Sequence, residues 1–132
     1  MADNVRQMAY REPVIQAIRK GLPTGRLEKM ARVLSVDRGV LVGILGISER
    51  TLQRKHRSSD RLSPSASDRL SRMDRIVSLA TEVFGNQDKA AQWLIRPSRT
   101  LANEVPLQLL DTDAGTQQVE RELRAIQHGF VY

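Results

Sequence analysis

The 132-residue chain contains no cysteine, which excludes disulfide bonds and cysteine-based zinc or redox sites. A chain without disulfides suits a reducing cytosol, so we expect a cytoplasmic protein. No apolar run approaches the roughly 20 residues that a membrane helix requires. The first residues also lack a basic stretch followed by an apolar core. The sequence therefore predicts neither a membrane partner nor a signal peptide.

Aromatic residues are scarce, at 4% of the chain, although hydrophobic residues make up 40%. The core must therefore be built mostly from leucine, isoleucine, valine, alanine and methionine. This hydrophobic content is too high for a disordered chain. The length suits one domain, or two small lobes that share a core.

Acidic residues are under-represented in the first two thirds of the chain. Residues 1–84 hold 16 lysines and arginines against 9 acidic residues, whereas residues 85–132 hold 5 against 6. The N-terminal part therefore suits a polyanion and the C-terminal part does not. Charge alone does not choose between DNA, RNA and an anionic membrane.

The hydrophobic spacing is helical nearly everywhere, which predicts an all-α fold without strands. Thr24, Ser48, Asn86 and Asp111 or Thr112 are candidate helix N-caps, and Gly85 is a candidate left-handed C-cap. The spacing and these end signals predict helices over residues 12–20, 24–34, 38–45, 48–56, 66–84, 87–96, 106–110 and 113–128.

A serine-rich segment with Pro64, residues 57–67, reads as a linker. We place a domain boundary there, which gives domains over residues 1–63 and 64–132. The helix that follows carries a broad apolar stripe. Such a stripe predicts burial on one face, and we interpret it as a candidate homodimer surface.

Residues 38–57 have the pattern of a helix-turn-helix. Gly46 stands where the tight turn needs a positive φ, and Ile47 is placed to hold the turn in the core. Leu52 then faces inward between the two helices. Val42 departs from the pattern, which usually has alanine there.

The outward face of the second helix carries side chains suited to DNA. Arginine and glutamine can make paired hydrogen bonds to guanine and adenine in the major groove, and residues near the helix N-terminus can reach phosphates. The alternative is a helical hairpin with a solvated arginine face. The predicted DNA-binding residues are Ser48, Glu49, Arg50, Thr51, Gln53, Arg54 and Arg57.

The last four residues, Gly129, Phe130, Val131 and Tyr132, are unusual because a chain terminus is normally polar. Three large apolar residues after a helix-ending glycine must be covered by something. One explanation is packing of Phe130 against its own helix. The other is contact with a partner protein.

The chain shows no catalytic or metal-binding pattern. His56 and His128 have no ligand-spaced partner, and helix capping explains Asp111 and Asp113 better than paired acids do. Trp93 reads as a core residue. We therefore predict a protein that is not an enzyme and that holds neither a cofactor nor a metal.

The C-terminal half carries a set of residues whose order and spacing are together specific. They are Ser67-Asp68-Arg69-Leu70, Ala80, Val83-Phe84-Gly85, Ala90, Trp93-Leu94, Pro97, Leu101, Pro106-Leu107, Leu109-Leu110, Thr112, Gly115, Val119, Leu123, Ile126 and Gly129. In these residues the chain resembles the toxin-binding domain of the Xre/MbcA/ParS antitoxins. One departure is that Leu101-Ala102-Asn103-Glu104-Val105 stands where the family has Leu-Gly-Gly before its Pro-Leu.

The resemblance implies a bacterial antitoxin with an N-terminal Xre-like helix-turn-helix bundle that binds operator DNA. It also implies that the C-terminal end, Gly129 to Tyr132, enters the active site of a RES-type toxin that consumes NAD. A stand-alone transcriptional regulator with a C-terminal dimerisation domain is the main alternative. A small enzyme or an RNA-binding protein is a third.

Overall fold

The computed structural model describes residues 13–57 and 61–129, with the side chains of residues 56 and 57 also left out. Every regular element in these residues is helical, and the only β-type pairings there are two isolated bridges. The all-α prediction is confirmed. After an N-terminal helix over residues 13–20, the elements are α2 Gly25–Leu34, α3 Arg38–Leu45, α4 Glu49–Arg57, α5 Pro64–Phe84, α6 Gln87–Ile95, the 3-10 turns η1 Arg99–Leu101 and η2 Pro106–Asp111, and α7 Asp113–Gln127.

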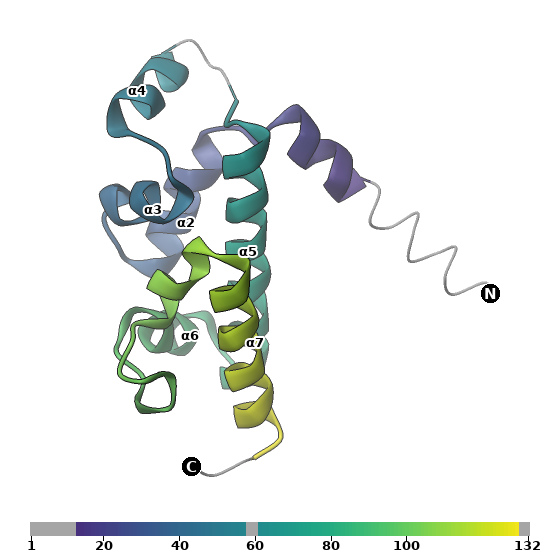
Figure 1. The fold of residues 1–132 in the computed structure, drawn as a ribbon, viewed down its shortest axis with the longest axis vertical. Coiled ribbons are helices and arrows are strands. Elements are labelled where there is room, and N and C mark those ends of the chain that lie inside the picture. Colours follow the sequence, from purple (N-terminus) through teal and green to yellow (C-terminus); the bar gives the residue numbers. More distant parts are fainter. Residues whose placement is uncertain (1–12, 58–60, 130–132) are drawn as a thin grey trace, which may run out of the picture.

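Helix α5, with 21 residues, runs along the long axis of the molecule (Figure 1). Helices α6 and α7 and the turn η2 pack against it, and α3 contacts it as well. Its apolar stripe, which includes Leu70, Met73 and Ile76, is buried within the chain itself. The predicted burial of this stripe is confirmed, but the stripe leaves little apolar surface on α5 for a second subunit.

The helix ends follow the side-chain chemistry of the sequence. Ser63 Oγ accepts a hydrogen bond from Ala66 N, Asn86 Oδ1 from Lys89 N, and Thr112 Oγ1 from Gly115 N. Gly85 closes α5 with φ 83°. Thr24 stands at the predicted N-cap position of α2, but its backbone is already helical and its side chain makes no capping hydrogen bond.

The linker expected over residues 57–67 is shorter than predicted, because α5 begins at Pro64. Leu62 N donates to Leu22 O at 2.9 Å, and Leu22 N donates to Ser67 Oγ at 2.8 Å. These bonds tie the start of α5 to the segment before α2. The boundary between residues 63 and 64 stays a prediction, since α5 packs against elements on both sides of it.

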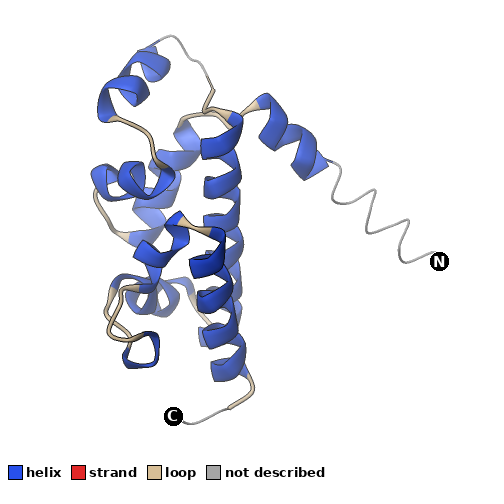
Figure 2. Cartoon of the chain, viewed as in Figure 1, coloured by secondary structure: helices blue, strands red, loops and turns tan. Residues whose placement is uncertain are grey.

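The N-terminal helix projects away from the body of the molecule (Figure 2). Its Val14 is 48% exposed and its Ile15 is 45% exposed, which makes them the most exposed large hydrophobic residues in the described part of the chain. None of the helices described is long and apolar enough to cross a membrane.

Candidate functional site

The turn between α3 and α4 has the geometry that the sequence predicts. Gly46 has φ 70°, and its amide donates to Gly43 O. A Cβ at Gly46 would lie 2.6 Å from Arg69 Nη1, so the guanidinium of Arg69 rests against the turn. Ile47 donates its amide to Val42 O and packs against the core. The positive φ of Gly46 therefore favours glycine at this turn, whereas the Arg69 side chain could move to admit a Cβ.

Ser48 caps the start of α4, as predicted. Its Oγ accepts a hydrogen bond from Thr51 N at 3.0 Å and donates one to Thr51 Oγ1 at 2.7 Å. The cap satisfies one of the backbone N–H groups that the first turn of a helix leaves without a partner. Ser48 remains exposed, so it still lies at the surface where a phosphate would approach.

Leu52 anchors α4 to the rest of the protein with 0% of its surface exposed, which confirms its inward orientation. Arg50, Gln53 and Arg54 are exposed on the other side of the helix. Residue 57 lies seven positions after residue 50, so Arg57 belongs to the same helical face, although its side chain is outside the described residues. The structure thus brings Arg50, Gln53 and Arg54 together on one solvent-facing surface.

Glu49 has a partner that the sequence reasoning missed. Arg38 Nε and Nη2 donate to the two carboxylate oxygens of Glu49 at 3.2 and 3.3 Å. Arg38 Nη1 donates to Glu28 Oε1 at 3.1 Å. These hydrogen bonds raise the pKa of Arg38 above its ordinary value, and the bond with Glu28 contributes more than those with Glu49. The predicted DNA-binding residue Glu49 is therefore already engaged within the chain.

Several basic residues on α4 and in the segments that follow it have intramolecular partners. Lys55 Nζ donates to Arg61 O, and Arg61 Nη1 donates to Gly21 O, both at 3.0 Å. Arg72 lies 3.7 Å from Asp113 and 3.9 Å from Asp68. Lys55, Arg61 and Arg72 are therefore engaged within the chain.

The end of α7 lies at the opposite end of the long axis from α4 (Figure 1). Gly129 ends α7: its φ is 75°, and its amide donates to Ile126 O at 3.0 Å. The other predicted toxin-binding residues, Phe130, Val131 and Tyr132, lie outside the described residues. Both explanations of this apolar end therefore stay predictions.

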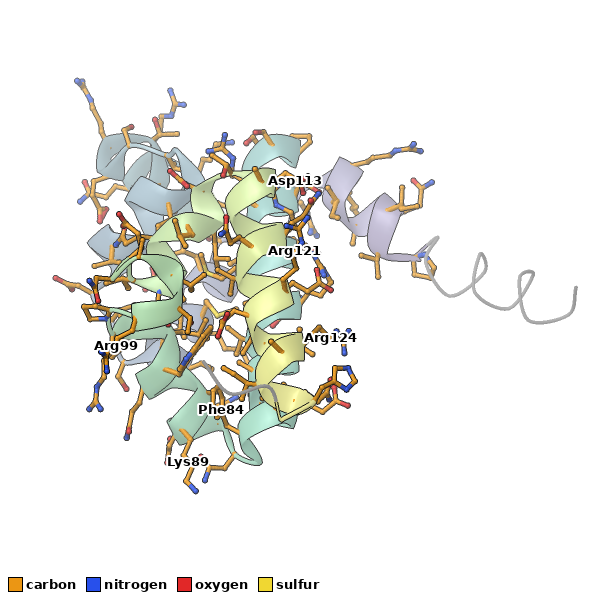
Figure 3. The ribbon with its side chains drawn as sticks, turned by 60° about the horizontal axis from the view of Figure 1, so that its bottom comes forward. Phe84, Lys89, Arg99, Asp113, Arg121 and Arg124 are labelled. Atoms are coloured by element: carbon orange, nitrogen blue, oxygen red, sulfur yellow. The ribbon has the colours of Figure 1, made fainter. Side chains whose placement is uncertain are left out.

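An aromatic pair lies at the same end of the molecule. The rings of Phe84 and Trp93 are 5.7 Å apart and tilted by 41°. Both side chains are partly buried and pack against the core, as predicted for Trp93. In Figure 3, Phe84 and Lys89 lie near the end of α7, whereas Asp113 lies at its start.

The acidic and histidine residues of the described segments are not gathered for metal binding. No group of three or more potential ligands occurs in residues 13–57 and 61–129. Asp113 lies 3.7 Å from Arg72 and accepts a hydrogen bond from Gln117 at 2.9 Å. It therefore acts as a local structural residue at the start of α7.

Two family models match the chain. The antitoxin Xre-like helix-turn-helix domain matches residues 13–73, and the antitoxin Xre/MbcA/ParS C-terminal toxin-binding domain matches residues 79–129. These domains are not catalytic. The first model extends past the turn and α4 into α5, and the second ends at Gly129.

The curated relatives support the same family. The chain is 33% identical to an antitoxin Xre of Photorhabdus laumondii over 121 residues, which cover 90% of this chain and 82% of that protein. It is 37% identical to an antitoxin Xre of Pseudomonas putida over 97 residues, 71% of this chain and 61% of that protein. A Prs ADP-ribosylating antitoxin of Sphingobium sp. is 29% identical over 124 residues, 87% of this chain and 78% of that protein. With a helix-turn-helix, a matched toxin-binding domain and these relatives, the chain belongs to the Xre antitoxin family.

Proposed function

We propose that this chain neutralises a cognate RES-type toxin with its C-terminal end and represses its own operon through α4, in the cytoplasm of a bacterium. The observation that carries the proposal is the separation of the two surfaces. Helix α4 and the end of α7 lie at opposite ends of the long axis (Figure 1), so one molecule has room for DNA and toxin together. A protein that exchanged one partner for the other would not need this arrangement.

The toxin would be held by the last four residues, Gly129 to Tyr132. The left-handed backbone of Gly129 ends α7 directly before these apolar residues in the sequence. Tyr132 offers a ring, a hydroxyl and, where the chain ends there, a carboxylate. In the cleft of a toxin that consumes NAD, that carboxylate would occupy the position of a phosphate next to an arginine.

Truncation tests this role. A chain without residues 130–132 is expected to lose protection when it is co-expressed with the toxin encoded beside it, while it still retards operator DNA in a gel shift. The matched control replaces His128, which is exposed in the last turn of α7, with glutamine and should still protect. A truncated chain that protects as well as the full chain would refute the insertion.

In this proposal, DNA is bound by the exposed face of α4. Arg50, Gln53, Arg54 and Arg57 would face the major groove, and Ser48 and Thr51 would lie near the phosphates. A symmetric operator would be read by a homodimer. Since the stripe of α5 is buried in its own chain, the exposed Val14 and Ile15 of the N-terminal helix are the better candidates for the dimer contact.

The chemistry of the toxin has a second candidate. The Sphingobium relative is named a Prs ADP-ribosylating antitoxin, which favours a partner that transfers ADP-ribose to a protein. Incubating the purified toxin with NAD labelled in its adenine moiety distinguishes a toxin that only consumes NAD from one that transfers ADP-ribose to a protein. Free labelled ADP-ribose supports NAD consumption, whereas label that stays on a protein band supports transfer. A stand-alone regulator would leave any such toxin uninhibited.

A further inference from the structure

Helix α4 is little buried against the rest of the protein. Of its residues whose side chains are described, 49–55, only Leu52 is buried. At its C-terminal end, Lys55 Nζ donates to Arg61 O at 3.0 Å. The helix stands at the edge of the molecule rather than between other helices (Figure 1). One buried leucine fixes the distance of a helix from the core, but it leaves the rotation and tilt of that helix poorly determined.

Arg38 supplies a second attachment at the opposite end of α4. Glu49 is the first residue of α4, and its two oxygens accept hydrogen bonds from Arg38 at 3.2 and 3.3 Å. The same guanidinium reaches Glu28 on α2 at 3.1 Å. One planar side chain at the start of α3 therefore joins α2, α3 and α4. A forked pair of this kind fixes direction as well as distance, which a lysine cannot do.

The exposed fractions of the three side chains suit a positioning role. Arg38 is 33% exposed, Glu28 29% and Glu49 45%. The cluster is open enough to form without a large desolvation cost. Because two acids share one arginine, the guanidinium carries no surplus charge to offer to a phosphate.

We propose that Arg38 is a positioning residue of the DNA-binding site: it orients α4 through Glu49 and does not itself contact DNA. This inference rests on the proposed DNA binding by α4. It also changes the role of Glu49. Glu49 then acts within the chain by holding Arg38, and we assign base reading to Arg50, Gln53 and Arg54 on the exposed face.

The closing experiment compares Arg38→Lys and Arg38→Gln in the full chain with the matched control Arg32→Lys, an exposed arginine in the last turn of α2. The DNA probe is a duplex that carries the promoter region of the chain's own operon, titrated at several salt concentrations. Thermal unfolding checks that each variant is folded.

A positioning role predicts that Arg38→Lys weakens binding roughly three- to tenfold although the charge is kept, because the forked pair is lost. The salt dependence should stay as in the wild type, since no phosphate contact is removed. Glu49→Gln should weaken binding by a similar factor, and the double variant Arg38→Lys/Glu49→Gln should be no weaker than either single variant. Arg32→Lys should bind like the wild type.

Wild-type affinity for Arg38→Lys, together with a shallower salt dependence for Arg38→Gln, would overturn the proposal and make Arg38 a phosphate contact. Hydrogen exchange of the α4 amides gives a readout that needs no DNA. It should be faster in both Arg38 variants than in Arg32→Lys, and unchanged protection would also overturn the proposal. If the wild-type chain does not bind the promoter duplex, the proposed DNA binding is refuted. The hydrogen-exchange rates of the α4 amides would still decide whether Arg38 holds α4 in place.

Discussion

Gly115, in the first turn of α7, is the glycine that the fold leaves least room to replace. A Cβ there would collide with the carbonyl oxygen of Leu109 and lie 2.9 Å from its carbonyl carbon and 3.1 Å from Thr112 Oγ1. Thr112 Oγ1 is also the cap that accepts from Gly115 N. We expect Gly115→Ala to lower the free energy of unfolding by about 1–3 kcal/mol, because the backbone must shift to admit the methyl group. Urea unfolding measures this change.

Gly43, in α3, is the matched control for this substitution. A Cβ there would meet nothing within 4 Å, and the residue is helical and exposed. Gly43→Ala should raise the free energy of unfolding by about 0.5–1 kcal/mol, because alanine loses less conformational freedom in a helix. Equal effects of the two substitutions would contradict the close approach of Gly115 to Leu109.

Individual residues were predictable where their role is local. The left-handed turn at Gly46, the cap by Ser48 and the inward orientation of Leu52 depend on residues within a few positions of each other, so the sequence pattern contains them. Arg38 is different. Its partners lie 10 and 11 positions away, in two other helices. Such pairs exist only once the helices are placed, and no spacing rule reveals them.

At the scale of elements, the exposed face of α4 carries the proposed recognition of DNA. Replacing Arg50 and Arg54 together with alanine is expected to weaken operator binding at least tenfold, because each paired contact to a base contributes about 1–3 kcal/mol. It should also flatten the salt dependence if either arginine touches a phosphate. A gel shift at several salt concentrations measures both.

The control for this double substitution is Arg96→Ala/Arg99→Ala, which removes two exposed arginines at the end of α6 and in η1. The two double variants therefore have the same net charge. Binding by this variant should match the wild type. Equal loss in both double variants would mean that overall positive charge, rather than the face of α4, attracts the DNA.

The helices themselves were largely predictable, since apolar spacing and caps mark their bounds. Their partners were not. The stripe of α5 indicated a buried face, but periodicity does not say what covers that face, and α6, α7 and η2 of the same chain do so. The N-terminal helix shows the same limit of periodicity. Its Val14, Ile15 and Ile18 have the spacing of a buried face, yet Val14 and Ile15 are exposed.

At the scale of the whole molecule, the distribution of charge along the sequence matches the separation of the two proposed binding surfaces. The sequence divides into a basic N-terminal part and a nearly neutral C-terminal part. The structure sets α4 and the end of α7 at opposite ends of the long axis. The division was predictable from composition, but the distance between the two surfaces was not, because it depends on how α5 packs with its neighbours.

The N-terminal helix gives the proposed homodimer a testable surface. Val14→Asp/Ile15→Asp should convert a dimer into a monomer in sedimentation at micromolar concentration, because two charges would replace the apolar residues that a second copy covers. Gln16→Asp, an exposed change on the other side of the same helix, should leave the dimer intact. The monomeric variant should also bind the operator more weakly, since each α4 would then read a half-site alone. A wild-type chain that sediments as a monomer would contradict the dimer, and a dimer that survives both aspartates would move its interface away from this helix.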